Sequence, residues 1–251
     1  MIEIKNLYKS FEGQTVLKDI SFRFQQGITN LIIGRSGSGK TVLVKSILGL
    51  LEIDEGEIWY DERNFVKISQ KERKALRREI GMVFQGGALF DSLSVEANVG
   101  FPLEMFTNLT AREKEKRIDF CLDHVNIEKT AYKLFPSEIS GGMKKRVAIA
   151  RAIALNPKYL FCDEPNSGLD PETATIIDRL IQDLTKEFQM TTIINTHDMN
   201  SVLEIGESVM FISKGEVCWE GTNKEILKTN NEKLNDFIFA NKIYDQMRKD
   251  L

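Results

Sequence analysis

The sequence predicts an α/β fold: a P-loop core built on a parallel sheet, an N-terminal layer of antiparallel strands and an inserted α-helical subdomain. Three observations predict it. Apolar and polar residues alternate in short runs over the first sixty positions, a glycine-rich segment joins an apolar strand to a helix at 34–41, and strands and helices alternate beyond residue 142. Because no repeat, low-complexity tract or proline-rich linker divides the chain, we expect one main domain over residues 1–230 and a helical extension over 231–251.

The first elements are expected to be short strands with one buried face. Alternating apolar side chains mark them, at Ile2, Ile4 and Leu7, at Ile20, Phe22 and Phe24, and at Ile58 and Tyr60. The run 28–34 is mostly apolar and shows no alternation with charged residues, which is typical of a strand buried on both faces. It leads into the glycine-rich turn and a helix-compatible stretch over 41–51, so the parallel sheet is expected to begin here.

The middle of the chain is expected to be helical. Residues 69–79 are strongly charged, and over 109–133 Thr110 and Glu113 have the spacing of a capping box at a helix start. We expect a helical subdomain inserted at about residues 90–145. The later elements are expected to be a helix over 144–155, a strand over 159–162, a helix over 171–188, a strand over 191–195, a helix over 200–205 and strands over 208–213 and 216–219.

Composition excludes some classes of partner. The net charge of −3 gives no global electrostatic reason to bind nucleic acid or an anionic membrane. Cys121, Cys162 and Cys218 lie far apart in the sequence, so reduced thiols and no disulfides are expected. The start of the chain lacks the apolar segment of a secretory signal, and no apolar run approaches the about 20 residues needed to span a bilayer. We therefore expect a cytosolic chain that meets a membrane only through a partner.

Residues 34–41 match the pattern G-x-x-x-x-G-K-[ST] in full, in the strand-to-helix position that this motif needs. Glycines allow successive N–H groups and the positive end of the helix to face phosphates, Lys40 reaches the β and γ oxygens, and Thr41 offers its hydroxyl to Mg²⁺. The alternative, a glycine-rich turn that binds no ligand, would not require the Lys-Thr pair. We expect a nucleoside triphosphate to be bound by Gly34, Arg35, Ser36, Gly37, Ser38, Gly39, Lys40 and Thr41.

Two carboxylates follow the apolar strand that ends at Cys162. Asp163 is expected to hold Mg²⁺ through water, and Glu164, one residue on, to polarise the attacking water as general base. The alternative is a pair of surface carboxylates that cap a strand end. The phosphate loop favours the catalytic interpretation, with Lys40 also acting on the transferred phosphate.

A second phosphate-binding helix start is expected at Ser140, Gly141, Gly142 and Met143, shortly before the strand that carries the carboxylates. A flexible Ser-Gly-Gly loop is the alternative. At this point the sequence resembles the ABC ATPase family, whose signature LSGGQ is similar to ISGGM here, with Ile139 and Met143 in place of the usual Leu and Gln. The resemblance implies a RecA-like core, ATP and Mg²⁺ as cofactors, and a second copy of the chain whose signature residues contact the γ-phosphate.

The other landmarks of that family occur in order over residues 2 to about 225. By resemblance, Phe11 stacks on adenine, Gln85 senses Mg²⁺ and the water, Asp170 belongs to the D-loop at 167–170, and His197 is the switch histidine. Each taken singly could be structural. Together they imply an active ATPase. A phosphotransferase would need an acceptor-substrate domain and would not need the signature. The ABC proteins of translation and DNA repair carry two cassettes or a long coiled coil between the motifs, and this sequence shows neither.

The segment 86–103 is unusually apolar for a surface. It could form the core of the helical subdomain, a groove for a cytoplasmic helix of a membrane permease, or both. With Met143 in the signature, this segment resembles the ATPases of Mla-type, MCE-associated systems, which move phospholipids between the inner and outer membranes of Gram-negative bacteria. That resemblance implies an MlaE-like permease, a periplasmic MCE lipid-binding protein and a location at the cytoplasmic face of the inner membrane. The alternative is an ABC importer or exporter of a small solute.

The C-terminal extension carries an apolar stripe at helical spacing. This stripe could stabilise a dimer by reaching the second copy, or it could pack on its own domain. Its residues are Phe237, Ala240, Tyr244, Met247 and Leu251.

Overall fold

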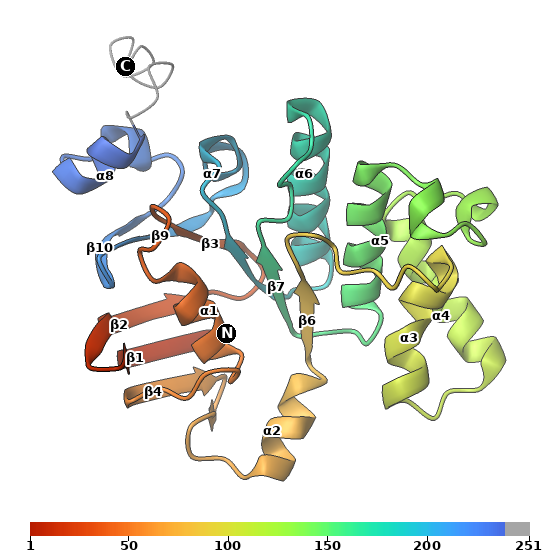
Figure 1. The fold of residues 1–251 in the computed structure, drawn as a ribbon, viewed down its shortest axis with the longest axis horizontal. Coiled ribbons are helices and arrows are strands. Elements are labelled where there is room, and N and C mark those ends of the chain that lie inside the picture. The colour runs from red at the N-terminus through yellow and green to blue at the C-terminus, as the bar shows by residue number, and fades with distance from the viewer. Residues whose placement is uncertain (239–251) are drawn as a thin grey trace.

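The computed structural model describes residues 1–238, in which two sheets are surrounded by helices (Figure 1). A four-stranded sheet has the order β2-β1-β4-β5, and a six-stranded sheet has the order β10-β9-β3-β8-β7-β6. This arrangement confirms the α/β class, with the antiparallel layer beside the parallel core and a group of helices at the opposite end (Figure 1).

The antiparallel layer forms as the alternation of apolar residues predicts. Its register pairs Ile2 with Phe24 and Ile4 with both Phe22 and Ile58, so these apolar side chains share one buried face. The strands are β1 (Ile2–Phe11), β2 (Gln14–Phe24), β4 (Glu55–Tyr60) and β5 (Arg63–Asn64).

The parallel sheet carries the functional loops at the carboxyl ends of its strands. β3 is buried at all five positions, and its side chains alternate between two cores: Leu31 and Ile33 face one, Ile32 the other. Only β10 runs antiparallel to its neighbour. The strands are β6 (Ile80–Val83), β7 (Tyr159–Asp163), β8 (Thr191–Asn195), β3 (Thr29–Ile33), β9 (Ser208–Ser213) and β10 (Glu216–Gly221).

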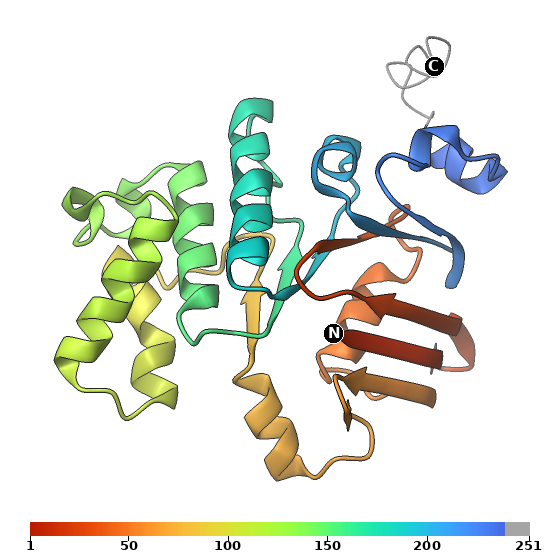
Figure 2. The same ribbon diagram turned by 180° about the vertical axis from the view of Figure 1, so that it is seen from behind.

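Helices cover the parallel sheet and extend beyond it. One face carries α1 (Lys40–Ile47) and the antiparallel layer, and the other carries α6 and α7 (Figures 1 and 2). The expected helix over 41–51 is shorter, because Gly49 adopts a left-handed φ of 66° just after it. Besides α1 and the separate helical group, the α-helices are α2 (Gln70–Arg77), α6 (Pro171–Glu187), α7 (Met199–Ile205) and α8 (Glu232–Ile238).

The helical group consists of α3 (Val95–Phe106), α4 (Ala111–His124) and α5 (Gly141–Ile153), which pack on one another. The capping box at the start of α4 is confirmed, since Thr110 and Glu113 exchange hydrogen bonds there. α5 begins three residues earlier than expected, because Ser140 caps it by accepting the Met143 N–H. α5 also contacts β6 and α6, so it links the helical group to the parallel sheet.

Neither membrane spans nor disulfides occur in the described part of the chain. No helix among residues 1–238 has the length and apolar character to cross a bilayer. The three cysteines are free thiols, and burial raises the pKa of Cys121 to about 11. Of the apolar stripe in the extension, Ala240, Tyr244, Met247 and Leu251 lie outside the described residues.

Candidate active site

The loop between β3 and α1 requires glycine at two positions. Gly34 and Gly39 have φ values of 154° and 109°. A Cβ at Gly34 would lie 2.3 Å from the carbonyl oxygen of Ile212, and one at Gly39 would lie 2.8 Å from Cδ2 of Leu17. A side chain at either position would therefore push this loop away from the core.

The backbone of this loop presents donors for an anion. Ser38 donates its N–H to the carbonyl of Arg35 at 3.1 Å, whereas the N–H groups of Gly37, Gly39, Lys40 and Thr41 donate to no protein group in residues 1–238. The start of α1 has no side-chain cap, so its positive end is also open. The buried hydroxyl of Ser38 likewise has no partner among the described residues. These groups fit a bound phosphate chain.

Lys40 lies along the same loop with only 8% of its surface exposed. Its ammonium group donates to the carbonyl oxygens of Gly34, at 2.7 Å, and Arg35, at 3.1 Å. Burial lowers its pKa, and the negative charges of Glu164 and Asp163 oppose this shift. Since those carboxylates act on it, Lys40 and the end of β7 share one site.

Asp163 and Asn195 lie side by side at the ends of β7 and β8. The amide of Asn195 donates to Oδ1 of Asp163 at 2.6 Å, while its buried Oδ1 has no partner within the described residues. A carboxylate, the Thr41 hydroxyl and the Gln85 amide are oxygen donors of the kind that Mg²⁺ prefers. The residues present therefore fit Mg²⁺.

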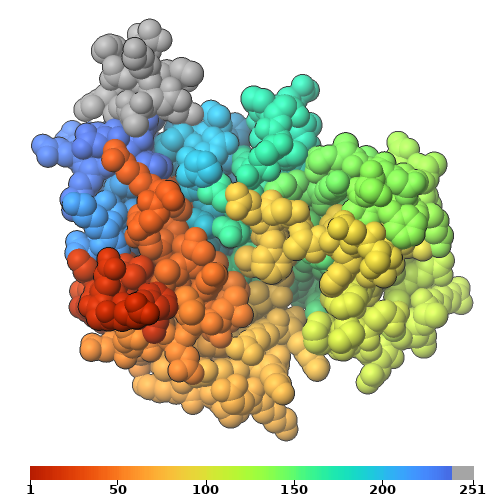
Figure 3. All heavy atoms as spheres, in the orientation of Figure 1, coloured from red at the N-terminus to blue at the C-terminus, as the bar shows by residue number. Residues whose placement is uncertain are grey.

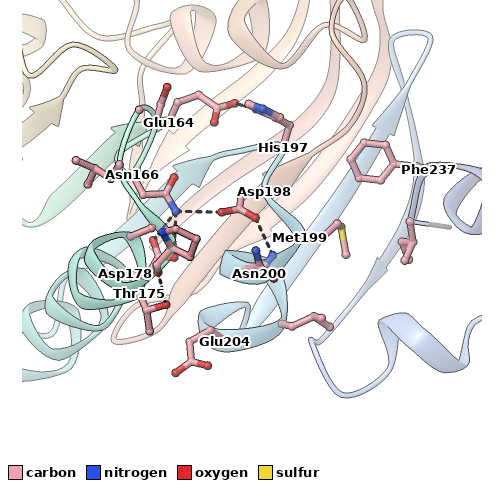
Figure 4. A pocket seen from close by; sticks show the side chains of 17 residues that line it. Glu164, Asn166, Thr175, Asp178, His197, Asp198, Met199, Asn200, Glu204 and Phe237 are labelled. Carbon is pink, nitrogen blue, oxygen red and sulfur yellow. Dashed lines mark hydrogen bonds and ion pairs between the residues drawn. The ribbon is translucent and has the colours of Figure 1, made fainter. Parts of the chain in front are cut away.

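Glu164 directly follows β7 in an unusual backbone conformation. Its φ of 47° is left-handed, and its N–H donates to the carbonyl of Asn195 at 2.9 Å. Its side chain pairs with Nδ1 of His197 at 2.6 Å (Figure 4). It also accepts a hydrogen bond from Thr196 at 3.4 Å. The loops after β7 and β8 thus hold the carboxylate and the imidazole together. They do so at the edge of a cavity of about 1240 Å³.

Gln85 is exposed after β6, and its amide donates to the hydroxyl of Ser167 at 3.3 Å. Sequence reasoning missed Lys145 of α5, whose buried ammonium group donates to the backbone carbonyl of Gln85. Burial lowers the pKa of Lys145, and Glu164 opposes this shift. The basic residues that follow Met143 could have drawn attention to this lysine. Its contact with Gln85 could not be predicted, because the two residues lie 60 positions apart in the sequence.

The predicted signature residues lie at the start of α5, away from the phosphate loop. Ser140 and Gly141 are exposed, Gly142 and Met143 are partly exposed, and no hydrogen bond within residues 1–238 joins them to residues 34–41. Figures 1 and 2 show α5 and α1 on opposite sides of β7. The chain alone does not bring its two predicted phosphate-binding helix starts together.

Phe11 and Asp170 make contacts other than with the carboxylates. Phe11 is 41% exposed at the end of β1, with the Lys9 ammonium 5.3 Å from its ring centre. Asp170 caps α6 by accepting the N–H and the hydroxyl of Thr173, and these bonds lower its pKa. Among the residues described, no hydrogen bond joins Phe11 or Asp170 to the phosphate loop.

The start of the C-terminal extension packs beside the phosphate loop, a contact that sequence reasoning missed. Arg35 donates to the carbonyl of Asp236 at 3.0 Å, and the ring of Phe237 lies 5.4 Å from that of Phe211 on β9. Leu234 and Ile238 are buried. Residues 232–238 therefore pack on their own domain, which was one of the two alternatives for the stripe.

Comparison with known proteins agrees with this geometry. The family model described as "ABC transporter" matches residues 17–167. The methionine import ATP-binding protein MetN of Clostridioides difficile is 40% identical over 95% of this chain and 74% of its own length. The intermembrane phospholipid transport system ATP-binding protein MlaF of Haemophilus influenzae is 35% identical over 95% of this chain and 90% of its own length.

A solved structure shows a related protein with nucleotide. It is a dimeric, post-hydrolysis state of an ATP-binding cassette bound to ADP and phosphate, 33% identical, with a TM-score of 0.79 over 89% of this chain and 99% of that one. This likeness fits the phosphate loop, the carboxylates and the histidine described above. The chain therefore belongs to the ABC transporter family, as an ATPase that binds ATP with Mg²⁺ and acts in transport.

Proposed function

We propose that this chain hydrolyses ATP at the site between the phosphate loop and Glu164, and that hydrolysis powers phospholipid movement between the inner and outer membranes of a Gram-negative bacterium. The observation that supports the catalytic part is the meeting of Lys40, Asp163 and the Glu164–His197 pair at the ends of adjacent parallel strands. Ligands of α/β proteins commonly bind at this edge of the sheet.

Binding is assigned to the phosphate loop. The open N–H groups of residues 34–41 and the ammonium of Lys40 hold the phosphates of ATP, and Phe11 stacks on the adenine. Thr41, Gln85 and Asp163 would hold Mg²⁺, which when bound would neutralise charge on the phosphate oxygens. The exposed ring of Phe11 and the unpartnered Ser38 hydroxyl support this assignment.

Proton transfer is assigned to Glu164. Its carboxylate accepts the proton of the attacking water, and His197 fixes the carboxylate and faces the γ-phosphate. Gln85 orients the same water from the other side. The 2.6 Å contact between Glu164 and His197 supports this division of roles.

A second copy of the chain completes each site. Ser140, Gly141, Gly142 and Met143 start α5 and are exposed or partly exposed, so they are open to ATP held by a partner copy, with Asp170 at the same interface. The dimeric state of the solved relative supports this proposal. In our account ATP closes the dimer, closure moves a permease, and hydrolysis with phosphate release reopens it.

The permease is proposed to dock in a groove of about 780 Å³ between α2 and the helical group. Figure 3 shows this hollow in the surface. The rim is cationic, and Arg151 anchors the wall by donating to the carbonyls of Gly87 and Ala88. The occupant we propose is a cytoplasmic permease helix with an apolar face and acidic residues. The groove is lined by Phe84, Phe90, Phe101 and Phe106, and its rim carries Lys74, Arg77 and Arg78.

We propose that the substrate is a phospholipid. The segment 86–103 and Met143 resemble those of phospholipid transport ATPases, and the phospholipid transport relative MlaF is 35% identical to this chain. The complex would then contain an MlaE-like permease and a periplasmic MCE protein, with this chain at the cytoplasmic face of the inner membrane. Import of a small solute is the second candidate, because the methionine import relative is 40% identical.

Purification of the complex from native membranes tests the substrate. We expect a multi-spanning permease, an MCE-domain protein and bound phospholipid, identified by mass spectrometry. A permease that co-purifies with a solute-binding protein and without phospholipid would contradict the lipid proposal and support the small-solute one. The catalytic assignments would stand in either case.

A further inference from the structure

A buried polar cluster lies behind the Glu164–His197 pair, where α6 faces the loops that follow β7 and β8. The cluster consists of Asn166, Asp178 and Asp198, which Figure 4 shows, and of Ser201. Asn166, Asp178 and Ser201 are 6%, 3% and 1% exposed. Buried polar groups destabilise a fold unless they are hydrogen-bonded, so the geometry of this cluster is constrained.

The side-chain amide of Asn166 contacts each of the other three residues of the cluster. Its nitrogen lies 2.7 Å from the hydroxyl of Ser201, 3.2 Å from Oδ2 of Asp178 and 3.4 Å from Oδ2 of Asp198. An amide has only two hydrogens to donate, so these acceptors share them. The hydroxyl of Ser201 also bonds to Asp178, which gives that carboxylate a second donor.

The cluster joins the two segments that carry the reacting groups. Asn166 lies two positions after Glu164, in a turn closed by the hydrogen bond from the Ser167 N–H to the Glu164 carbonyl at 3.1 Å. Asp198 directly follows His197 and caps α7 by accepting the Asn200 N–H at 2.9 Å. Asp178, on α6, contacts both segments through Asn166 and Ser201.

We propose that Asp178 is a positioning residue for ATP hydrolysis. As a carboxylate it accepts hydrogen bonds from Asn166 and Ser201, and it thereby holds the Glu164 and His197 loops at the separation that hydrolysis needs. This inference rests on the proposed roles of Glu164 and His197. It assigns Asp178 no contact with ATP.

The surroundings of Asp178 make its charge sensitive to pH near neutrality. Burial raises its pKa to about 6; the nearby carboxylates of Asp198 and Glu204 add to this shift, and the bonds from Ser201 and Asn166 oppose it. From β7 the thiol of Cys162 also faces it, and Asp178 contributes to raising the pKa of that thiol. As the pH falls through about 6, Asp178 gains a proton and loses acceptor capacity.

The effects of protonation on stability and on activity have opposite signs. The pKa of Asp178 is about 6 in the folded chain and 3.8 for an ordinary aspartate. The fold therefore binds this proton more tightly than the unfolded chain, and the Asp178 contribution to stability rises as the pH falls from 6 towards 4. A loss of kcat over this range is thus not due to unfolding driven by Asp178.

The test measures kcat and KM for ATP from pH 5 to 8 in the purified chain, in Asp178→Asn and in Asp183→Asn. Asp183 lies on the same helix but is exposed, which makes it a matched control. We expect Asp178→Asn to lower kcat about 10-fold or more, since small misplacements of catalytic groups are costly. KM should change little, and the decline of kcat near pH 6 should disappear. Asp183→Asn should behave as wild type.

Ser201→Ala provides a second test that does not change the carboxylate. Loss of this donor should raise the pKa of Asp178, so the decline of kcat should move to higher pH. A folded Asp178→Asn with wild-type kcat and pH profile would overturn the proposal, and so would an unmoved decline in Ser201→Ala. Wild-type turnover in Glu164→Gln would instead discard the catalytic roles on which the inference rests, so the two failures are distinguishable.

Discussion

At the scale of single residues, the ammonium group of Lys40 is held by two carbonyls of the phosphate loop and lies beside two carboxylates. These contacts fix the buried ammonium group of Lys40 in a position to bind phosphate oxygens. The same small region holds Glu164 in a left-handed conformation that directs its side chain to His197. Both features follow from loops at the ends of parallel strands.

Replacement of Lys40 by Ala is expected to weaken ATP binding. A hydrogen bond to a charged group contributes about 1.5–3 kcal/mol, which corresponds to a loss of about 10- to 150-fold in affinity. Isothermal titration calorimetry measures the change. Lys45→Ala is the control, because Lys45 is an exposed lysine on the same helix. Equal affinities of wild type and Lys40→Ala would remove Lys40 from the site.

Replacement of Glu164 by Gln is expected to retain ATP binding and to slow hydrolysis. Removal of a general base lowers the rate by about 10²- to 10⁴-fold. A phosphate-release assay at saturating ATP measures kcat, with the exposed Glu172→Gln as control. If Glu164→Gln turned over ATP near the wild-type rate, another group would have to be the base.

Residues of the candidate site could be predicted where those that belong together are neighbours in the sequence. The phosphate loop and the Asp163–Glu164 pair follow strands and were predicted directly from their motifs. The contacts of Lys145 with Gln85, of Arg35 with Asp236 and of Asn166 with Asp178 join positions 60, 201 and 12 apart. Pattern and spacing do not encode such contacts, because they depend on how elements pack.

At the scale of elements, α2, α3 and α5 shape the proposed permease groove. The rings of Phe90 and Phe101 lie 4.6 Å apart in its wall, and the guanidinium of Arg151 lies 5.8 Å from the ring of Phe90. This is why 86–103 is apolar at the surface: part of it packs into the helical group, where Val95, Val99 and Leu103 are buried, and part of it lines the groove. The structure thus shows the core role of this segment and a groove beside it, and the use of that groove by a permease stays a proposal.

Phe101→Asp is expected to uncouple the ATPase from its permease. The groove is open, so the variant should fold and retain its basal ATPase activity, while a buried negative charge opposes docking of an apolar helix face. Transport by the reconstituted complex should fall at least about 10-fold if docking loses 1.4 kcal/mol or more.

Phe135→Asp is the matched control for the groove. Phe135 is similarly exposed, at 42% against 36% for Phe101, but lies outside the groove. Transport by the reconstituted complex that carries Phe135→Asp should equal that of the wild-type complex. Unchanged transport in Phe101→Asp, or equal losses in the two variants, would show that the permease docks elsewhere.

α8 is expected to stabilise the domain to which it belongs. Leu234 is fully buried, so Leu234→Ala should lower the free energy of unfolding by about 2–5 kcal/mol, as is usual for this change in a core. Urea denaturation followed by circular dichroism measures the difference. Leu50→Ala, at a site 64% exposed, should change stability by less than about 0.5 kcal/mol. Equal changes in the free energy of unfolding in Leu234→Ala and Leu50→Ala would contradict a stabilising role of α8.

At the scale of the whole molecule, the fold class and the order of strands and helices could be predicted because periodicity and glycine-rich turns mark them locally. Helix ends were less predictable: capping by Ser140 and the left-handed Gly49 moved two of them. The division into a domain over 1–230 and an extension over 231–251 stays a prediction. The packing of α8 on β9 favours counting residues 232–238 with the domain.

The arrangement of the chain keeps its two predicted phosphate-binding helix starts apart. The phosphate loop and the signature residues lie on opposite sides of β7, and no hydrogen bond between them occurs in residues 1–238 (Figure 1). One solved relative is a dimer with ADP and phosphate, which supports the proposal that a second copy supplies its signature residues to each site. We therefore propose that ATP is bound between two copies of the chain.

Sedimentation velocity of Glu164→Gln with and without ATP and Mg²⁺ tests that claim most directly. Slow hydrolysis in this variant should trap the closed state, so we predict a monomer without nucleotide and a dimer of two chains at saturating ATP. Bound nucleotide should equal one ATP per chain. A species that binds ATP but stays monomeric at saturation would contradict the account.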